Sequence, residues 1–228
     1  MPSDPITVSL IGKGRIGAQV ARGLNDLPGY QLVAVVGRHD DDLPSARLTI
    51  DAAGPQALRR HGAAALSTGD LWTVGAAALI DPVLREQLQA TALRKRHKLC
   101  LFTDWISGPT LCPPSLTSRL FIRQFSPTLS DNPGVLFRGP LSEAAARFPD
   151  QLNTATAAAI CGPGIDATHV TLTATPKGGA HRIAARFVMP GQTIRTEVRF
   201  DGTGPHPVAS AILAALARRA EPVSIGGW

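Results

Sequence analysis

In the first part of the chain, short runs of β-branched and other apolar residues alternate with Ala- and Leu-rich stretches of helical periodicity. Parallel strands need long crossover connections, which are usually helices, so this alternation indicates βαβ units around a parallel sheet. The predicted strands are 6–11, 31–36, 48–51, 71–74 and 98–102. The predicted helices are 15–26, 55–62 and 82–95.

The pattern changes after residue 106, where strand-like runs follow one another with fewer helices between them. Such a run of strands is typical of an α+β domain. The predicted strands are 119–125, 133–138, 167–174, 181–188 and 193–200, and the predicted helices are 142–148, 152–160 and 207–219. We therefore predict an α/β protein: a doubly wound parallel sheet over 1–106, completed by a C-terminal helix within 207–228, and an α+β domain over 107–206.

Composition excludes a membrane protein and a metal protein of the common kinds. No apolar run approaches the roughly 20 residues that a membrane span needs. The first residues lead into a strand without a basic segment and a long apolar stretch, which argues against secretion. The cysteines Cys100, Cys112 and Cys161 match no zinc-ligand spacing and no CxxC pair. We expect a cytoplasmic protein with no membrane partner and no metal site.

The formal net charge of +6 raises the question of nucleic acid. Arginine is spread along the chain, however, and the one dense basic run, 94–98, closes a predicted helix, where cations interact favourably with the helix dipole. No aromatic-plus-basic stacking motif accompanies the charge in the sequence. We therefore expect no nucleic-acid partner.

The Gly-rich segment 12–17 follows an apolar strand and precedes a helix. In the Rossmann dinucleotide-binding motif the first glycine permits a tight turn, the second lets the backbone approach the pyrophosphate, and the third allows helix and strand to pack closely. The alternative is a tight strand–helix turn without a ligand. The predicted cofactor-binding residues here are Gly12, Gly14, Arg15, Ile16 and Gly17.

The end of the second predicted strand bears on the choice between NAD and NADP. NAD sites usually carry Asp or Glu there to bind the ribose 2′-hydroxyl, but this chain has Gly37 followed by Arg38. A guanidinium suits a 2′-phosphate, so the sequence favours NADP over NAD. Two alternatives stay open: Arg38 is a solvent-facing loop residue, or Asp40 reaches the ribose because the strand is longer.

Beyond the Gly-rich motif, the chain resembles the L-aspartate dehydrogenase family, as a divergent member. The resemblance implies hydride transfer between NAD(P) and the α-carbon of a small amino acid, with L-aspartate and iminoaspartate or oxaloacetate as the leading pair. It also implies that the second domain binds substrate and that the protein is a homodimer, whose dimer face is the second sheet. The segments that carry it are 51–58, 74–82 and 135–139, then Glu143, Phe148, Pro149, Asn153 and Ala155.

The resemblance assigns two further site residues. His181 falls where the family has its catalytic histidine, and an imidazole exchanges protons near neutral pH. Asn153 would reach the nicotinamide, where an amide can both donate and accept hydrogen bonds. The plain alternatives are a strand histidine at the surface and a helix N-cap.

The chain departs from the family at several pocket positions. Asp104 and Trp105 replace small residues of the family, Thr175 replaces an Asp, and Gly179 replaces an Asn. His206 stands in the segment that carries a Lys in the family. We predict that Trp105 contacts the cofactor and that Asp104 and His206 contact the substrate. The departures leave two alternatives: another amino or keto acid as substrate, or a dinucleotide-binding scaffold without catalysis.

Overall fold

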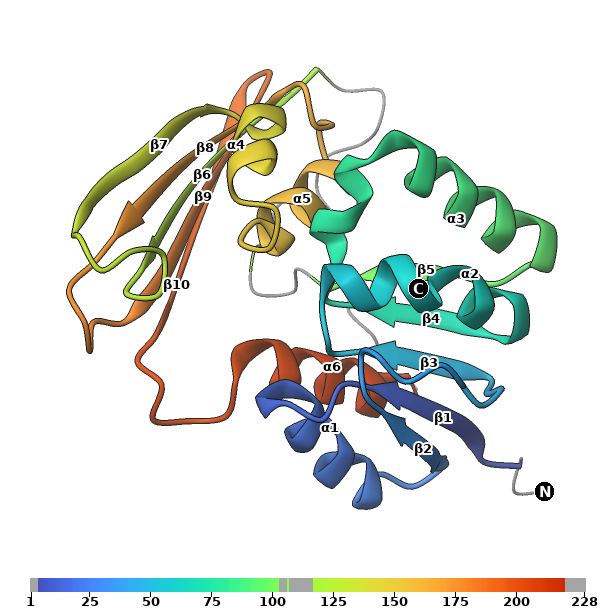
Figure 1. Ribbon diagram of the computed structural model, residues 1–228. Helices are drawn as coiled ribbons and strands as arrows, with labels where there is room; N and C mark the ends of the chain where they lie inside the picture. Colours follow the sequence, from blue (N-terminus) through green and yellow to red (C-terminus); the bar gives the residue numbers. More distant parts are fainter. Residues whose placement is uncertain (1–3, 103–105, 107–116, 220–228) are drawn as a thin grey trace. The chain divides into compact units, whose positions relative to one another are not determined.

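The computed structural model describes residues 4–102, 106 and 117–219 (Figure 1). The chain divides into two compact units. The first consists of Met1–Phe102 and His206–Trp228, and the second of Thr103–Pro205. The second unit is thus inserted between the sheet of the first unit and its last helix.

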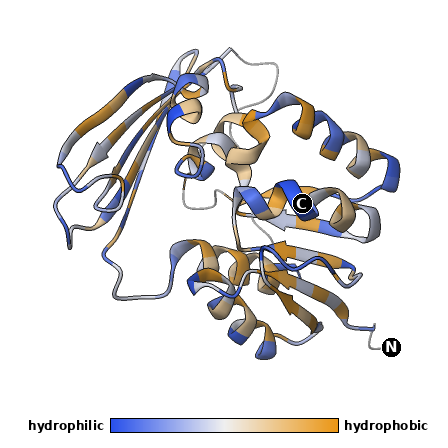
Figure 2. Cartoon of the chain, in the orientation of Figure 1, coloured by the Kyte–Doolittle hydropathy of each residue, from blue (hydrophilic) through white to orange (hydrophobic). Residues whose placement is uncertain are grey.

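Sheet A of the first unit has five parallel strands in the order β2-β1-β3-β4-β5. Figure 2 shows hydrophobic residues along these strands, and all four residues of β3 are buried. β3 is covered on both faces, so its polar residues Thr49 and Asp51 are buried together with Leu48 and Ile50. The strands are β1 (Ile6–Ile11), β2 (Tyr30–Val36), β3 (Leu48–Asp51), β4 (Asp70–Thr73) and β5 (Leu99–Leu101).

Four α-helices pack with sheet A, in two pairs. Helix α1 contacts α6, and α2 contacts α3. A Cβ atom at Gly23 of α1 would lie 2.5 Å from Leu213 of α6, so the first pair approaches closely. The helices are α1 (Arg15–Asn25), α2 (Pro55–Thr68), α3 (Pro82–Lys95) and α6 (Pro207–Arg218).

Strand order places a ligand-binding edge in this unit. From β1 the chain crosses to β2 on one side, and β3 then lies on the other side of β1. The carboxyl ends of β1 and β3 therefore border a topological switch point, where open α/β sheets bind their ligands. The loops that follow these two strands are 12–14 and 52–54.

Sheet B of the second unit has five strands in the order β10-β9-β6-β8-β7, and β6 pairs with β8 in parallel. The other pairings are antiparallel. Helix α4 (Leu141–Arg147) packs against β7 and β8, and α5 (Asn153–Ile160) contributes buried alanines. The strands are β6 (Arg119–Ser126), β7 (Gly134–Pro140), β8 (Thr168–Ala174), β9 (His181–Met189) and β10 (Gln192–Phe200).

The fold class predicted from the sequence is confirmed, with two differences in detail. Helix α2 continues past Gly62 to Thr68, because Ala65 and Leu66 extend its buried face. The short 3₁₀ helix η1 (Ala76–Ile80) was not predicted, since five alanine-rich residues are too few to show a periodicity. No helix in the described ranges has the length and apolar character needed to cross a membrane.

Candidate active site

The turn after β1 requires glycine at two positions. Gly12 has φ of +116°, a backbone conformation that side chains disfavour, and its N–H donates to the Val36 carbonyl at 2.7 Å. A Cβ atom at Gly17 would lie only 1.9 Å from the Gly12 carbonyl oxygen. Helix α1 therefore begins in backbone contact with the end of the strand, as the sequence motif predicts.

Gly14 has a different explanation. Its φ of −79° and ψ of −168° are open to any residue, and a Cβ atom there would meet nothing within 4 Å. No contact with the residues that the structure describes requires glycine at this position. Gly14 is also the N-cap of α1 and provides no side-chain cap, so no cap side chain stands between the positive end of the helix dipole and an anion. The open space in front of an uncapped helix suits a pyrophosphate.

The other two predicted residues of this motif start α1. Arg15 is the first residue of α1 and is exposed, and Ile16 is partly buried behind it. Arg38 is exposed in the loop after β2, on the same edge of sheet A as the Gly-rich turn. The structure thus places the five predicted residues of the Gly-rich motif and Arg38 at the carboxyl edge of sheet A.

Asp40 folds back toward the end of β2. The strand ends at Val36, yet the Asp40 carboxylate accepts the Gly37 N–H at 2.7 Å and lies 3.3 Å from the Lys13 ammonium group. The hydrogen bond from Gly37, followed by Lys13, holds the pKa of the Asp40 carboxyl below its ordinary value. The Asp40 carboxylate therefore lies beside the Gly-rich loop, although β2 ends at Val36 and is not extended as the sequence alternative required.

Asp51 is a residue that the sequence analysis missed. It ends β3 with no exposed surface, and its carboxylate accepts hydrogen bonds from Ala53 N–H at 2.8 Å, Gly54 N–H at 3.2 Å and the Thr73 hydroxyl at 2.6 Å. The Thr73 hydroxyl in turn accepts the Gly75 N–H at 2.8 Å. Burial raises the pKa of Asp51 to about 6, against the opposing hydrogen bonds. The sequence feature that could have indicated this residue is a single acid at the end of a short predicted strand.

The Asp51 network joins two loops at the binding edge. One follows β3 and the other follows β4, and both start at strands whose carboxyl ends lie side by side. A Cβ atom at Gly75 would lie 2.6 Å from the Gly54 carbonyl carbon, so the two loops are in backbone contact. Asp51 therefore fixes the shape of the edge next to the Gly-rich turn.

His181 begins β9 and is partly buried in the second unit. Its Nδ1 lies 2.9 Å from the Ser126 hydroxyl, at the end of the neighbouring strand β6. Ser126 is buried and its hydroxyl also lies 2.9 Å from that of Thr128. This contact fixes the orientation of the imidazole ring, as a second residue does for many catalytic histidines.

The remaining predicted residues have mixed outcomes. Asn153 is the first residue of α5 and Leu152 is the N-cap, so the interpretation of Asn153 as an N-cap was wrong. His206 is the N-cap of α6, where its Nδ1 accepts the Val208 N–H at 3.3 Å, and its role toward a substrate stays a prediction. Asp104 and Trp105 lie outside the described residues.

Two of the positions that depart from the family lie next to each other. The Thr175 hydroxyl is buried and has no hydrogen-bond partner in the part of the chain that the structure describes. A Cβ atom at Gly179 would lie 3.3 Å from it. A longer polar side chain at residue 179 would therefore reach residue 175, which makes these two replacements a coupled pair.

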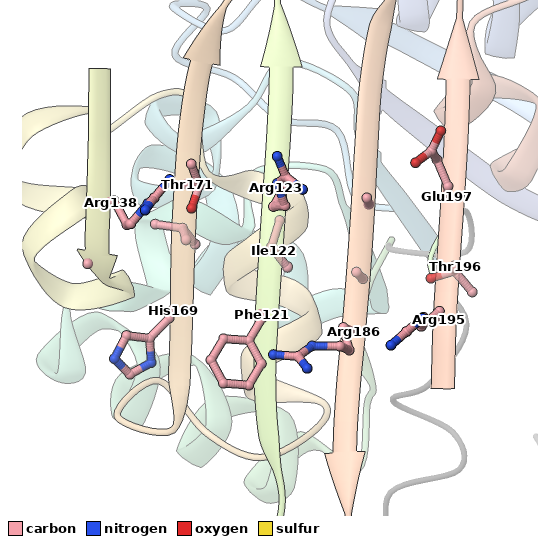
Figure 3. A pocket seen from close by; sticks show the side chains of 14 residues that line it. Phe121, Ile122, Arg123, Arg138, His169, Thr171, Arg186, Arg195, Thr196 and Glu197 are labelled. Atoms are coloured by element: carbon pink, nitrogen blue, oxygen red, sulfur yellow. The ribbon is translucent and has the colours of Figure 1, made fainter. Parts of the chain in front are cut away.

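A separate, shallow pocket of about 740 Å³ lies on sheet B, on the face opposite the buried side chains of β6 (Figure 3). It contains none of the predicted site residues. Its charge is strongly positive: Glu197 is its one acidic residue, and that carboxylate pairs with Arg182 at 3.4 Å. The arginines that line it are Arg123, Arg138, Arg186 and Arg195.

Strand register explains how this basic face forms. Arg123 and Arg138 flank Thr171 on the neighbouring strands, and Arg186 lies directly opposite Arg195. Directly opposed like charges are unfavourable in a sheet. Two phenylalanines of the same face offset part of the cost, since Arg186 lies 4.5 Å from the Phe121 ring centroid and Arg182 lies 3.7 Å from that of Phe125.

The described residues form no evident metal site. The described ranges contain no group of three or more His, Cys, Asp or Glu side chains that could hold a metal ion. Neither Cys100 nor Cys161 forms a disulfide bond in the part of the chain that the structure describes. Each unit therefore offers its own candidate residues, the Gly-rich turn and its surroundings in the first unit and the His181–Ser126 pair in the second.

Comparison with known proteins adds sequence evidence to this geometry. The family described as "Aspartate dehydrogenase, C-terminal" matches residues 111–220. The L-aspartate dehydrogenase of Ralstonia nicotianae is 30% identical over 204 residues, which are 78% of this chain and 75% of the relative. That of Ruegeria pomeroyi is 29% identical and covers 95% of this chain and 93% of its own.

Solved structures share the fold. The crystal structure of aspartate dehydrogenase from Thermotoga maritima gives a TM-score of 0.78 at 18% identity, over 97% of this chain and 99% of the other. Dihydrodipicolinate reductase from Paenisporosarcina gives 0.53 at 13% identity, over 94% of each chain. At these identities the two structures inform on the fold alone, and the first shows that it is shared over nearly the whole chain.

Proposed function

The chain belongs to the L-aspartate dehydrogenase family. We propose that it oxidises the α-carbon of a small amino acid, with L-aspartate as the leading substrate and a nicotinamide dinucleotide as the hydride acceptor. In this reaction the α-carbon loses a hydride and the amino group a proton, which gives iminoaspartate. Water then releases ammonia and oxaloacetate. The observation that carries the proposal is the Gly-rich turn, where Gly12 and Gly17 are required by packing and Gly14 by no contact with the described residues.

The residues of the first unit fit a dinucleotide. The N–H groups at the start of α1 would bind the pyrophosphate, with Arg15 and Ile16 forming the first turn of the helix. The nicotinamide supplies the hydride chemistry when it is bound, and the protein supplies binding and orientation. Asn153 would hold the carboxamide of the nicotinamide through a side-chain amide.

His181 would handle the protons of the reaction. A neutral imidazole can accept a proton from the water that adds to the imine carbon and can return it afterwards. Ser126 supports this role because its contact with Nδ1 holds the ring in one orientation. The substrate roles of Asp104 and His206 and the cofactor contact of Trp105 remain part of the proposal.

NADP is the cofactor that Arg38 favours. Its guanidinium lies on the exposed loop after β2 and can form charge-assisted hydrogen bonds to a 2′-phosphate. NAD remains an acceptable cofactor in this proposal because Asp40 lies in the same loop. The measured ratio of NADPH to NADH affinity decides between them.

We also propose a cytoplasmic homodimer, built through the open face of sheet B. Arginine and aromatic residues are enriched in the centres of protein interfaces, and this face carries both. Val135 of β7 is 58% exposed on the same sheet and adds apolar surface. The cysteines match no zinc-ligand spacing and no CxxC pair, which supports thiols in a reducing compartment.

The coupled change at Thr175 and Gly179 keeps a second function open. Loss of two polar groups next to each other in the second unit favours either another amino or keto acid as substrate, or a dinucleotide-binding scaffold without turnover. The scaffold predicts cofactor binding with no turnover on any of these acids.

The test follows the near-ultraviolet absorbance of the reduced nicotinamide with oxaloacetate and ammonium, and with L-aspartate in the reverse direction. Wild type should turn over, and His181→Ala should lose about 100-fold or more while it binds cofactor normally. His169→Ala, an exposed histidine of the same sheet, is the matched control and should keep its activity. Equal activity of His181→Ala and wild type would exclude His181 from the mechanism.

A further inference from the structure

The loop after β2 contains an acid in an unusual place. Rossmann sites for NAD carry their ribose-binding acid at the end of the second strand, which here is Gly37. The next residues turn the chain, with the Asp40 N–H donating to the Gly37 carbonyl at 3.3 Å. This turn returns the Asp40 side chain to the strand end, where it accepts the Gly37 N–H at 2.7 Å.

Gly37 and Asp40 are complementary in space. A Cβ atom at Gly37 would lie 3.0 Å from Asp40 Oδ1 and 3.3 Å from its Cγ. Any side chain at residue 37 would therefore press on the carboxylate that now lies there. Glycine at the strand end makes room for an acid supplied three positions later.

Lys13 holds the same carboxylate from the other side. Its ammonium group lies 3.3 Å from Asp40 Oδ2, the oxygen that also accepts the Gly37 N–H. No hydrogen bond to Oδ1 occurs within the described part of the chain, and the Asp40 side chain is 49% exposed. One oxygen is thus anchored while the other can accept a hydrogen bond from a ligand.

Lys13 is itself part of the Gly-rich turn, so this ion pair joins the pyrophosphate-binding loop to the adenosine-binding loop. A ribose lies between these two loops in a dinucleotide site. The hydrogen bonds from Gly37 and Lys13 hold the pKa of Asp40 below its ordinary value, so at neutral pH the group is a carboxylate whose oxygens only accept hydrogen bonds.

We propose that Asp40 accepts a hydrogen bond from the adenosine ribose 2′-hydroxyl and opposes a 2′-phosphate, against the attraction of Arg38. This inference rests on the proposed dinucleotide function and adds the residue that limits the preference for NADP. A 2′-phosphate would stand beside a carboxylate and repel it, and the same carboxylate keeps Lys13 from pairing with the phosphate. Removal of the Asp40 charge should therefore weaken the binding of NADH and strengthen the binding of NADPH.

The experiment measures dissociation constants of NADH and NADPH with the full chain, by fluorescence of the bound reduced nicotinamide. Asp40→Asn should weaken NADH about tenfold, the loss expected for one charged hydrogen bond, and should tighten NADPH. Asp41→Asn is the matched control, because Asp41 is the adjacent acid and pairs instead with Arg60. Its affinity ratio should equal that of wild type.

A second variant keeps the test independent of local disturbance. Gly37→Asp combined with Asp40→Ala moves the acid back to the strand end and removes the side chain that a residue at position 37 would contact. This double variant should restore the ratio of NADH to NADPH affinity that Asp40→Asn lowers. An unchanged affinity ratio in Asp40→Asn overturns the role of Asp40. Failure of the wild type to bind either cofactor would instead overturn the proposed function itself.

Discussion

Nδ1 of His181 lies 2.9 Å from the hydroxyl of Ser126, a residue 55 positions earlier in the chain. The contact arises because β6 and β9 are antiparallel neighbours whose ends meet at this point. Ser126 is 1% exposed in a strand that buries Leu120 and Ile122 on the same face, and its hydroxyl also accepts the Thr128 N–H at 3.2 Å. A buried hydroxyl that orients a histidine is an expected feature of a catalytic pair.

Ser126→Ala should lower kcat about tenfold and leave the cofactor dissociation constant unchanged, because the imidazole loses its anchor and nothing in the first unit changes. The pH dependence of kcat should shift as well, since the hydroxyl sets the environment of Nδ1. Thr128→Val keeps the serine contact and serves as control. A kcat equal to that of wild type would leave Ser126 with a structural role only.

Substitutions of Gly17 and Gly14 should affect different properties, protein stability for Gly17 and cofactor affinity for Gly14. Gly17→Ala places a methyl group 1.9 Å from the Gly12 carbonyl oxygen and should destabilise the protein by about 1–3 kcal/mol. Gly14→Ala meets no atom within 4 Å and should change stability by less than about 0.5 kcal/mol. It should nevertheless weaken cofactor binding at least tenfold, by roughly the 1.4 kcal/mol that corresponds to that factor.

Thermal unfolding and cofactor titration of both variants check this. Normal cofactor affinity in a folded Gly14→Ala protein would show that the open space in front of α1 is not the pyrophosphate site.

Asp51 should make stability depend on pH in an identifiable window. Its pKa is about 6 in the folded protein and near 3.8 in the unfolded chain, so the folded state binds the proton more tightly. Its contribution is complete below about pH 4 and is lost as pH rises to about 6. Asp51→Asn should abolish this loss, because an amide can accept from Ala53 and Gly54 and donate to Thr73.

The free energy of unfolding of Asp51→Asn relative to wild type should therefore rise between about pH 4 and pH 6, by up to roughly 3 kcal/mol. Denaturant titrations at several pH values measure it. The exposed Asp41→Asn provides the reference for charge removal without burial. A relative stability that is flat across this window contradicts a buried, raised pKa at Asp51.

Dimerisation through sheet B should strengthen with salt. A symmetric pair would bring two copies of an arginine-rich face together, and screening lowers this repulsion, with a Debye length of about 10 Å at 0.1 M salt and about 3 Å at 1 M. Arg186→Gln should promote the dimer at low salt, while Arg94→Gln on α3 should not. Light scattering after size-exclusion chromatography measures the mass. A monomer at every salt concentration would exclude this face.

The sequence predicted the elements well where the pattern is local. Strands β1 and β3 consist mostly of apolar and β-branched residues, and Gly12 and Gly17 are required by the backbone conformation and packing of the turn. Helix α2 was predicted too short because Gly62 interrupts the pattern, although its missing side chain only makes room for Leu58 and Leu88 at 3.1 Å. The local sequence pattern thus predicts which helices and strands form, whereas tertiary packing determines where each of them ends.

Contacts between distant strands could not be predicted in the same way. The Ser126–His181 contact depends on the register of β6 against β9, which no periodicity specifies. The arginines of sheet B are scattered in the sequence, so no aromatic-plus-basic motif was visible. Register brings Arg182 over Phe125 and Arg186 over Phe121, and these pairs cannot be predicted from residues so far apart in the sequence.

The last helix of the first unit has a consequence for how the protein is made. The Tyr30 hydroxyl at the start of β2 donates to the Leu216 carbonyl at 2.9 Å, across 186 positions, and His206 N–H donates to Gln19 of α1 at 2.8 Å. On the ribosome, sheet A therefore emerges long before the helix that covers α1. The inserted second unit is continuous and can fold during that interval, whereas a nascent chain that has not yet reached α6 keeps part of α1 uncovered and is open to capture by chaperones.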